Sequence, residues 1–148
     1  MQIEKVKEDI RKMLNAQRLG VLATYGDKYP YATIVGFATT DDLRYMLFAT
    51  LRNTRKYRNI MADPHVSILV DNRSNRAEDF SNAQALTILG TGMEMHEDEK
   101  HDLISLYINR HPYLTEFIAD PNCAIIKVKV DKYILVSRFQ EVTELDMQ

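Results

Sequence analysis

Six β-rich segments separated by short turns are the feature that most limits how this chain can fold. They comprise residues 21–25, 29–39, 44–50, 65–70, 83–94 and 124–139. Gly26 and Asp27 separate the first two, a spacing that is typical of a hairpin turn. Gly90 and Gly92 lie inside the fifth, where glycine indicates a bulge or bend of the kind that curves a barrel. The sixth alternates so regularly that we expect one long strand or two joined strands.

Helical patterns occupy the intervals between these segments. Apolar residues recur at helical spacing over residues 3–17, which predicts an amphipathic helix. A second helix is expected to begin after Asn53 or Thr54, which can cap it, and to end at Asp63. A third is expected over residues 97–109, with a short helix over 113–119. Residues 71–82 are polar and predict a long loop.

The order of these segments predicts a mainly β fold with peripheral helices, a six-stranded antiparallel barrel formed by residues 1–148 as a single domain. A barrel needs about eight strands before its interior can hold one small ligand. We therefore expect any ligand to lie on the outside of the barrel or at an interface between subunits.

Charge and composition exclude several classes of partner. The net charge is −2, so no overall positive field favours nucleic acid or an anionic membrane. The longest uncharged run, residues 80–93, is shorter than the roughly 20 apolar residues that a membrane-spanning helix needs. The charged N-terminus leads into no apolar run, so we expect no signal peptide and a cytoplasmic protein. Cys123 is the one cysteine and is expected to be a buried, inert thiol.

Residues 50–57 carry the most informative local pattern. The predicted helix start lies directly after a strand, and it brings together Thr50, Thr54, Arg55 and Lys56. Hydroxyl donors, two cations and the free N–H groups of a helix N-terminus can together bind a phosphate. The residues themselves also allow the plainer interpretation of a solvated basic face, which composition alone favours.

The strand over residues 29–39 is the second informative element. Its central part, residues 31–37, is apolar and has small residues at intervals, which would let a flat ring lie against its backbone. By itself the pattern is more typical of an ordinary buried strand. His96 and His101 are five residues apart, so they do not share a helix face, and no metal site is expected.

The order of these motifs resembles the pyridoxamine 5'-phosphate oxidase-like split β-barrel flavoproteins. The resemblance extends from about Leu19 to Val136. Its most specific part is the Thr-Arg-Lys block followed by Asn-x(3)-Asp-Pro. The segments that carry it are residues 31–37, 47–50, 54–56, 59–64 and 65–70.

The resemblance implies an FMN site. Arg55 and Lys56, next to Thr54, correspond to the basic pair that binds the FMN phosphate, and Ala49 and Thr50 correspond to the strand end beside it. The strand whose backbone lines the isoalloxazine ring corresponds to residues 31–36 and includes Tyr31, Thr33, Ile34, Val35 and Gly36. The family builds this site at a dimer interface, which implies a homodimer.

The sequence departs from the vitamin-forming enzymes of that family. Ala85, with Gln84 beside it, stands where those enzymes carry a glutamine near the ring, and the chain has no tryptophan. Residues 137–139 do not replace their substrate-binding Arg-x-His motif. Pyridoxamine phosphate is therefore not the expected substrate, and the chain is more similar to the general-stress and flavin-reductase-like branch.

The function expected from this resemblance is that of an FMN-dependent oxidoreductase. It would pass hydride or electrons between a nicotinamide donor and a small acceptor, and no catalytic side chain is identified. Three alternatives remain open at this point: a flavin carrier or redox sensor without turnover, the same fold with deazaflavin or haem, and an interaction module without a cofactor.

Overall fold

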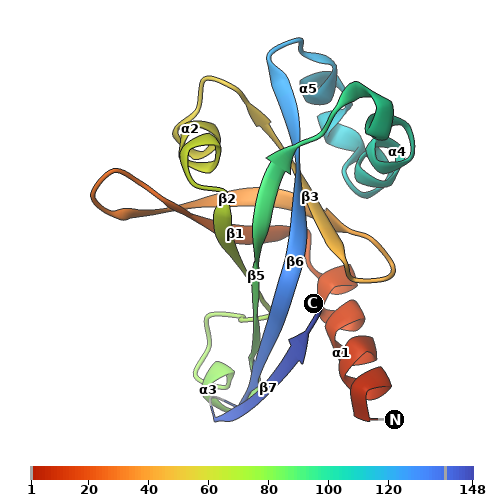
Figure 1. The fold of residues 1–148 in the computed structure, drawn as a ribbon. Helices are drawn as coiled ribbons and strands as arrows, with labels where there is room; N and C mark the ends of the chain where they lie inside the picture. The colour runs from red at the N-terminus through yellow and green to blue at the C-terminus, as the bar shows by residue number, and fades with distance from the viewer. Residues whose placement is uncertain (1, 139) are drawn as a thin grey trace.

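The computed structural model describes residues 2–138 and 140–148, apart from the side chains of residues 97, 100 and 101. Figure 1 shows a twisted barrel of strands with helices at its periphery. In chain order the elements are α1 (Gln2–Ala16), β1 (Leu19–Tyr25), β2 (Pro30–Thr39), β3 (Tyr45–Leu51), α2 (Arg55–Ala62), β4 (His65–Asp71), α3 (Asp79–Asn82), β5 (Gln84–Glu94), η1 (Glu97–Glu99), α4 (Lys100–Arg110), η2 (Pro112–Leu114), α5 (Thr115–Ala119), β6 (Cys123–Ser137) and β7 (Glu141–Asp146).

The strands close into the predicted six-stranded antiparallel barrel. Their order in the sheet is β3-β2-β1-β4-β5-β6, and β3 pairs with β6 to complete the circle. β7 then adds to the outer edge of β6 as a seventh strand of the same sheet. The fold class expected from the sequence is thus confirmed.

Glycine curves the barrel at β5, as the sequence predicted. The pairing of β5 with β6 shifts register between Leu89 and Gly90. A Cβ atom at Gly90 would lie 2.4 Å from the carbonyl oxygen of Lys129, so no larger residue fits here without moving the backbone of β6.

Two apolar layers hold the molecule together. The interior of the barrel is filled from all six strands and is closed at the side by Ile10, Met13 and Leu14 of α1. A smaller layer lies outside, where α4 and α5 cover the outer faces of β2, β3 and β6. Its fully buried members are Ala38, Leu47, Met95, Tyr107 and Ile125.

The last β-rich segment is one continuous strand, β6, which was one of the two expectations. The structure corrects the sequence predictions at three other places, of which the first is β7, a strand that was not predicted. The expected loop over residues 71–82 contains α3, and the expected third helix consists of η1 followed by α4. Phe139 and the side chain of His101 lie outside the described residues.

Two features are not found in this described part of the chain, a metal-binding cluster and a membrane-spanning helix. No group of three or more His, Cys, Asp or Glu side chains there is arranged to hold a metal ion. No helix in it is long and apolar enough to cross a membrane.

Candidate functional site

The barrel is incompletely paired between β2 and β3. β3 pairs with β6 along its whole length, from Tyr45 to Leu51. With β2 it pairs only at residues 37–39, whereas β2 continues to pair with β1 down to Pro30. Among the described residues, the facing edges of residues 32–36 in β2 and 49–51 in β3 therefore have no ladder partner, and we call them the open seam.

Hydrogen-bond direction shows which backbone groups face the open seam. Backbone groups in an antiparallel strand point alternately to one neighbour and to the other. The N–H of Phe37 donates to the Arg18 carbonyl on the β1 side, so Gly36 and its even-numbered neighbours in β2 face the seam. The N–H of Val130 donates to the Arg44 carbonyl, so the odd-numbered residues of β3 face it from the other side.

The start of α2 lies next to the β3 edge of the open seam. Thr54 caps the helix, because its hydroxyl accepts a hydrogen bond from the Tyr57 N–H at 3.3 Å and donates to the Leu51 carbonyl at 2.8 Å. The Thr50 hydroxyl lies 2.9 Å from that of Thr54 and is buried. Both hydroxyls that the sequence suggested for phosphate binding thus form local hydrogen bonds that order the turn between β3 and α2.

The basic cluster around α2 separates into paired and unpaired cations. Arg52 forms an ion pair with Glu94 at 2.5 Å, and the Tyr57 hydroxyl donates to the same carboxylate. The hydrogen bond to Glu94 is the main cause that raises the pKa of Arg52 and also that of Tyr57. Arg52, in the turn before α2, is therefore paired with β5, and Tyr57 connects α2 itself to the same carboxylate.

Arg55 and Lys56 differ from Arg52, since neither forms an ion pair within the part of the chain that the structure describes. The guanidinium of Arg55 lies 5.3 Å from the centre of the Tyr31 ring, within the range of a cation–π contact. Arg55 also lines a groove of about 850 Å³ between α2 and the turn that joins β1 to β2. Arg58 and Asn59 line the same groove.

The predicted ring-lining residues do not all face one way. Tyr31 and Thr33 are half-buried, and Val35 points into the barrel interior. Ile34 points outward and is 66% exposed. The structure thus gathers the predicted residues of β2, β3 and α2 around the open seam. Val35 is the exception, because its side chain points into the barrel and its backbone groups face β1.

Gly36 is held from the outside by a residue that was not predicted as part of the site. A Cβ atom at Gly36 would lie 3.3 Å from Cε1 of His111, so the imidazole packs directly on the strand backbone. His111 is buried, and its Nε2 donates to the Phe37 carbonyl at 2.6 Å. His111 also ends α4, since its N–H bonds to the Tyr107 carbonyl.

Tyr107 is the second such residue. Its hydroxyl donates to the Gly36 carbonyl at 2.7 Å, and its ring centre is 4.9 Å from that of His111. The only sequence signal for this pair is the four-residue spacing, which places both on one helix face.

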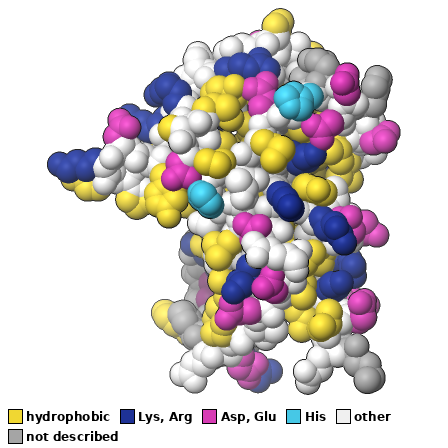
Figure 2. Space-filling view, viewed as in Figure 1, with side chains coloured by type: hydrophobic (Ala, Val, Ile, Leu, Met, Phe, Trp, Pro, Cys, Tyr) yellow, Lys and Arg dark blue, Asp and Glu magenta, His cyan; other side chains and the backbone are white. Residues whose placement is uncertain are grey.

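Other features lie away from the open seam. Gln84 and Ala85 line a cavity of about 600 Å³ beside α3, at the opposite end of the barrel from α2 (Figure 1). The Gln84 amide donates to the Ser137 hydroxyl. Cationic and anionic side chains alternate over the face shown in Figure 2, and no large patch of one sign covers it.

The comparisons with known proteins agree on a fold and a family. Residues 6–137 match a family described as Pyridoxamine 5'-phosphate oxidase. No curated protein matches the sequence.

Several solved structures are similar. A heme binding protein from Mycobacterium smegmatis superposes with a TM-score of 0.83 at 16% identity, covering 95% of this chain and 57% of its own. General Stress Protein 26 from Bacillus anthracis superposes with a TM-score of 0.68 at 22% identity, covering 95% of this chain and 98% of its own. An FAD-binding protein from Mesorhizobium loti superposes with a TM-score of 0.66 at 18% identity, covering 86% of this chain and 91% of its own. At these identities the likeness concerns the fold, and the chain spans little more than half of the first protein.

Proposed function

The chain belongs to the pyridoxamine 5'-phosphate oxidase family, and on that basis we propose that it is a homodimeric FMN-binding oxidoreductase with its flavin at the open seam. The observation that supports this most is the pair Arg55 and Lys56. The fold leaves these two cations without a carboxylate among the described residues, next to an unpaired strand edge.

The start of α2 suits a phosphate. Thr54 satisfies the N–H of Tyr57, while the N–H groups of Arg55 and Lys56 form no backbone bond within the described chain. With the two side-chain charges, these groups could bind the phosphate of FMN. In this proposal Thr50 and Thr54 shape the turn and do not themselves donate to the ligand.

The β2 edge of the open seam suits a flat heterocycle. The N–H and C=O groups of Ala32 and Ile34 point away from β1, and β3 does not pair with them. Such an edge alternates donors and acceptors, as the pyrimidine part of a flavin does. Ala32 has little side chain to obstruct a ring that approaches from the outer face, whereas His111 already covers that face of Gly36.

The proposed chemistry requires little of the protein beyond binding. FMN, when bound, would accept and pass on hydride or electrons, while the protein binds, orients and electrostatically tunes it. This is consistent with a site that has no acid–base pair or activated nucleophile among its described residues. We propose a nicotinamide nucleotide as donor and a small molecule as acceptor.

Exposed apolar side chains support the proposed dimer. Leu19 of β1 is 60% exposed, and Ile34 of β2 is 66% exposed. Leu19 lies opposite Gly36 in the β1–β2 ladder, so both side chains are on the outer face of the hairpin, beside the open seam. A second copy that covers this face would exclude water from a flavin at the seam.

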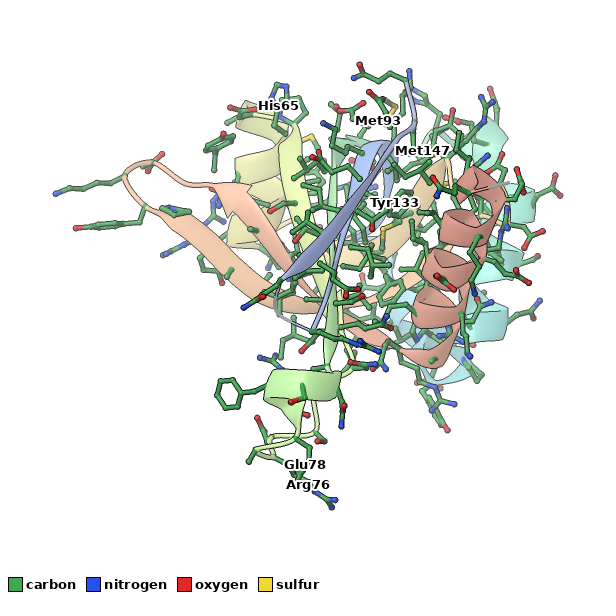
Figure 3. The ribbon with its side chains drawn as sticks, turned by 90° about the horizontal axis from the view of Figure 1, so that it is seen from below. His65, Arg76, Glu78, Met93, Tyr133 and Met147 are labelled. Atoms are coloured by element: carbon green, nitrogen blue, oxygen red, sulfur yellow. The ribbon has the colours of Figure 1, made fainter. Side chains whose placement is uncertain are left out.

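Haem is a second candidate, favoured by one observation. His65 lies at the outside of the molecule (Figure 3), and its Nδ1 is 2.8 Å from a carboxylate oxygen of Asp63. A carboxylate that fixes one imidazole nitrogen leaves the other free to bind a metal. His65 also lines a groove of about 390 Å³ with Tyr25 and Leu89.

The visible spectrum of the purified protein separates these candidates. Flavin bands, with FMN as the released chromophore, would support the proposal, and a Soret band that His65→Ala removes would replace it with haem. A deazaflavin would be identified on release. A colourless protein that takes up no added FMN would support an interaction module. If FMN is bound but neither NADH nor NADPH reduces it, a carrier or redox sensor is the better description.

The double variant Arg55→Ala with Lys56→Ala tests the phosphate assignment. Loss of two charge-assisted contacts, each about 1.5–3 kcal/mol, should weaken FMN binding at least 100-fold. Binding of riboflavin, which has no phosphate, should change little. The matched control, Arg73→Ala with Lys132→Ala, removes the same charge elsewhere on the barrel and should retain FMN. A double variant that purifies fully yellow would show the phosphate assignment to be wrong.

A further inference from the structure

The open seam begins where a side chain is inserted between the two strands. Continuing the β2–β3 register from Phe37 and Phe48 places Gly36 opposite Ala49. Both residues point toward the seam, so in an uninterrupted ladder the Ala49 N–H would donate to the Gly36 carbonyl. In this structure the Gly36 carbonyl accepts from the Tyr107 hydroxyl instead, at 2.7 Å.

The backbone N–H of Ala49, which points into the seam, also interacts with this hydroxyl. Burial raises the pKa of Tyr107 to about 12, and the Ala49 backbone N–H opposes this with a smaller effect. The phenol therefore keeps its proton up to strongly alkaline pH and donates it to the Gly36 carbonyl. A single hydroxyl thus occupies the place of the first missing ladder bond.

Tyr107 is firmly held in this position. It is 1% exposed and lies in the apolar layer that α4 forms on the outside of β2, β3 and β6. One turn later, His111 binds the Phe37 carbonyl and packs on Gly36. Between them, Arg110 donates to the carbonyls of Leu14 and Asn15 at the end of α1, at 3.1 and 2.9 Å. The last turn of α4 is therefore fixed to both β2 and α1.

We propose that Tyr107 is a positioning residue that keeps β2 and β3 apart, and thereby keeps the backbone edge at Ala32 and Ile34 free for the ring of a bound flavin. The ligand part of this inference rests on the proposed function. The geometric part does not, because pairing and hydrogen bonds alone establish the insertion. Without the hydroxyl, Ala49 can bond directly to Gly36, and the next pair to close would be Ile34 with Leu51.

The variant Tyr107→Phe tests the inference, because it removes the hydroxyl and retains the ring. Tyr133→Phe is a matched control. Tyr133 is a fully buried tyrosine within the barrel (Figure 3), and its hydroxyl donates to the Leu43 carbonyl, also at 2.7 Å. Each variant loses one buried hydrogen bond, so both should lose a similar part of their free energy of unfolding, about 1 kcal/mol.

Three measurements then distinguish positioning from stability. Tyr107→Phe should weaken FMN and riboflavin equally, about tenfold, since the effect concerns the ring and not the phosphate. In the ligand-free variant, hydrogen exchange of the Ile34 amide should slow as the strands pair. Tyr133→Phe should leave both flavin affinities and the Ile34 exchange rate unchanged.

The outcomes separate this inference from the proposed function. If wild-type protein binds neither FMN nor riboflavin, the proposed function is wrong, and Ile34 exchange alone decides whether Tyr107 keeps the strands apart. If wild-type protein binds FMN while Tyr107→Phe has the affinity of Tyr133→Phe and unchanged Ile34 exchange, the inference is overturned. A Tyr107→Phe variant that is weakened for FMN but not for riboflavin would also contradict it.

Discussion

β3 has one neighbour on each side, and the two seams that it forms are very different. Toward β6 it pairs continuously from Tyr45 to Leu51, and the side chains along this seam fill the barrel interior and the layer under α4. Toward β2 it pairs at three positions and then stops. The closed seam satisfies its own backbone groups, whereas the open seam leaves donors and acceptors for something else to bind. In our proposal, one edge of β3 therefore stabilises the fold and the opposite edge binds the ligand.

The largest expected effect is at the closed seam. Phe48→Ala removes a fully buried ring from the barrel interior, which should reduce the free energy of unfolding by about 3–5 kcal/mol. Chemical denaturation measures this, and Phe48→Leu should cost clearly less because it keeps most of the volume. A small loss for Phe48→Ala would contradict this comparison, because the closed seam would then contribute little to the free energy of unfolding.

An intermediate effect is expected at Thr54, where the open seam meets α2. Thr54→Ala should cost about 1 kcal/mol because the helix loses its cap. Thr54→Asp should keep the cap, since a carboxylate also accepts the Tyr57 N–H, but it places a negative charge where we propose a phosphate. We expect near-native stability with weaker binding of FMN and unchanged binding of riboflavin, both by fluorescence titration. Equal loss for both flavins would mean that no phosphate lies there.

The smallest effect on folding is expected at Ile34. Its side chain is 66% exposed, so Ile34→Ala should change the stability of one subunit by no more than about 0.5 kcal/mol. Because we place this side chain in the dimer contact, the variant should instead dissociate at a higher protein concentration. Light-scattering mass over a dilution series measures this. A wild-type mass that matches one chain would exclude the dimer.

Local patterns in the sequence were enough for most of the elements. Thr54 followed by an apolar stripe correctly predicted the start of α2, and the glycines of β5 correctly predicted the break in register. β7 was not predicted because Leu145 is its one buried residue, so its acidic sequence shows no alternation of apolar and polar residues. The barrel itself was predicted from segment order.

The candidate site was only partly predictable, for a physical reason. Which cations remain unpaired depends on long-range contacts such as Arg52 with Glu94, 42 positions apart. The insertion of Tyr107 between Gly36 and Ala49 likewise joins three distant segments. Sequence spacing could place Tyr107 and His111 on one helix face, but it could not show which strand that face would meet.

β7 has a consequence for how copies of this protein meet one another at high concentration. β3 covers β6 only as far as Lys129, and β7 covers the remaining length from Lys132 to Ser137. The free edge of the sheet is therefore transferred to a short strand whose exposed residues include Glu141 and Glu144. Repulsion between like charges disfavours edge-to-edge pairing of two such strands. We therefore expect β7 to disfavour aggregation through the edge of the sheet.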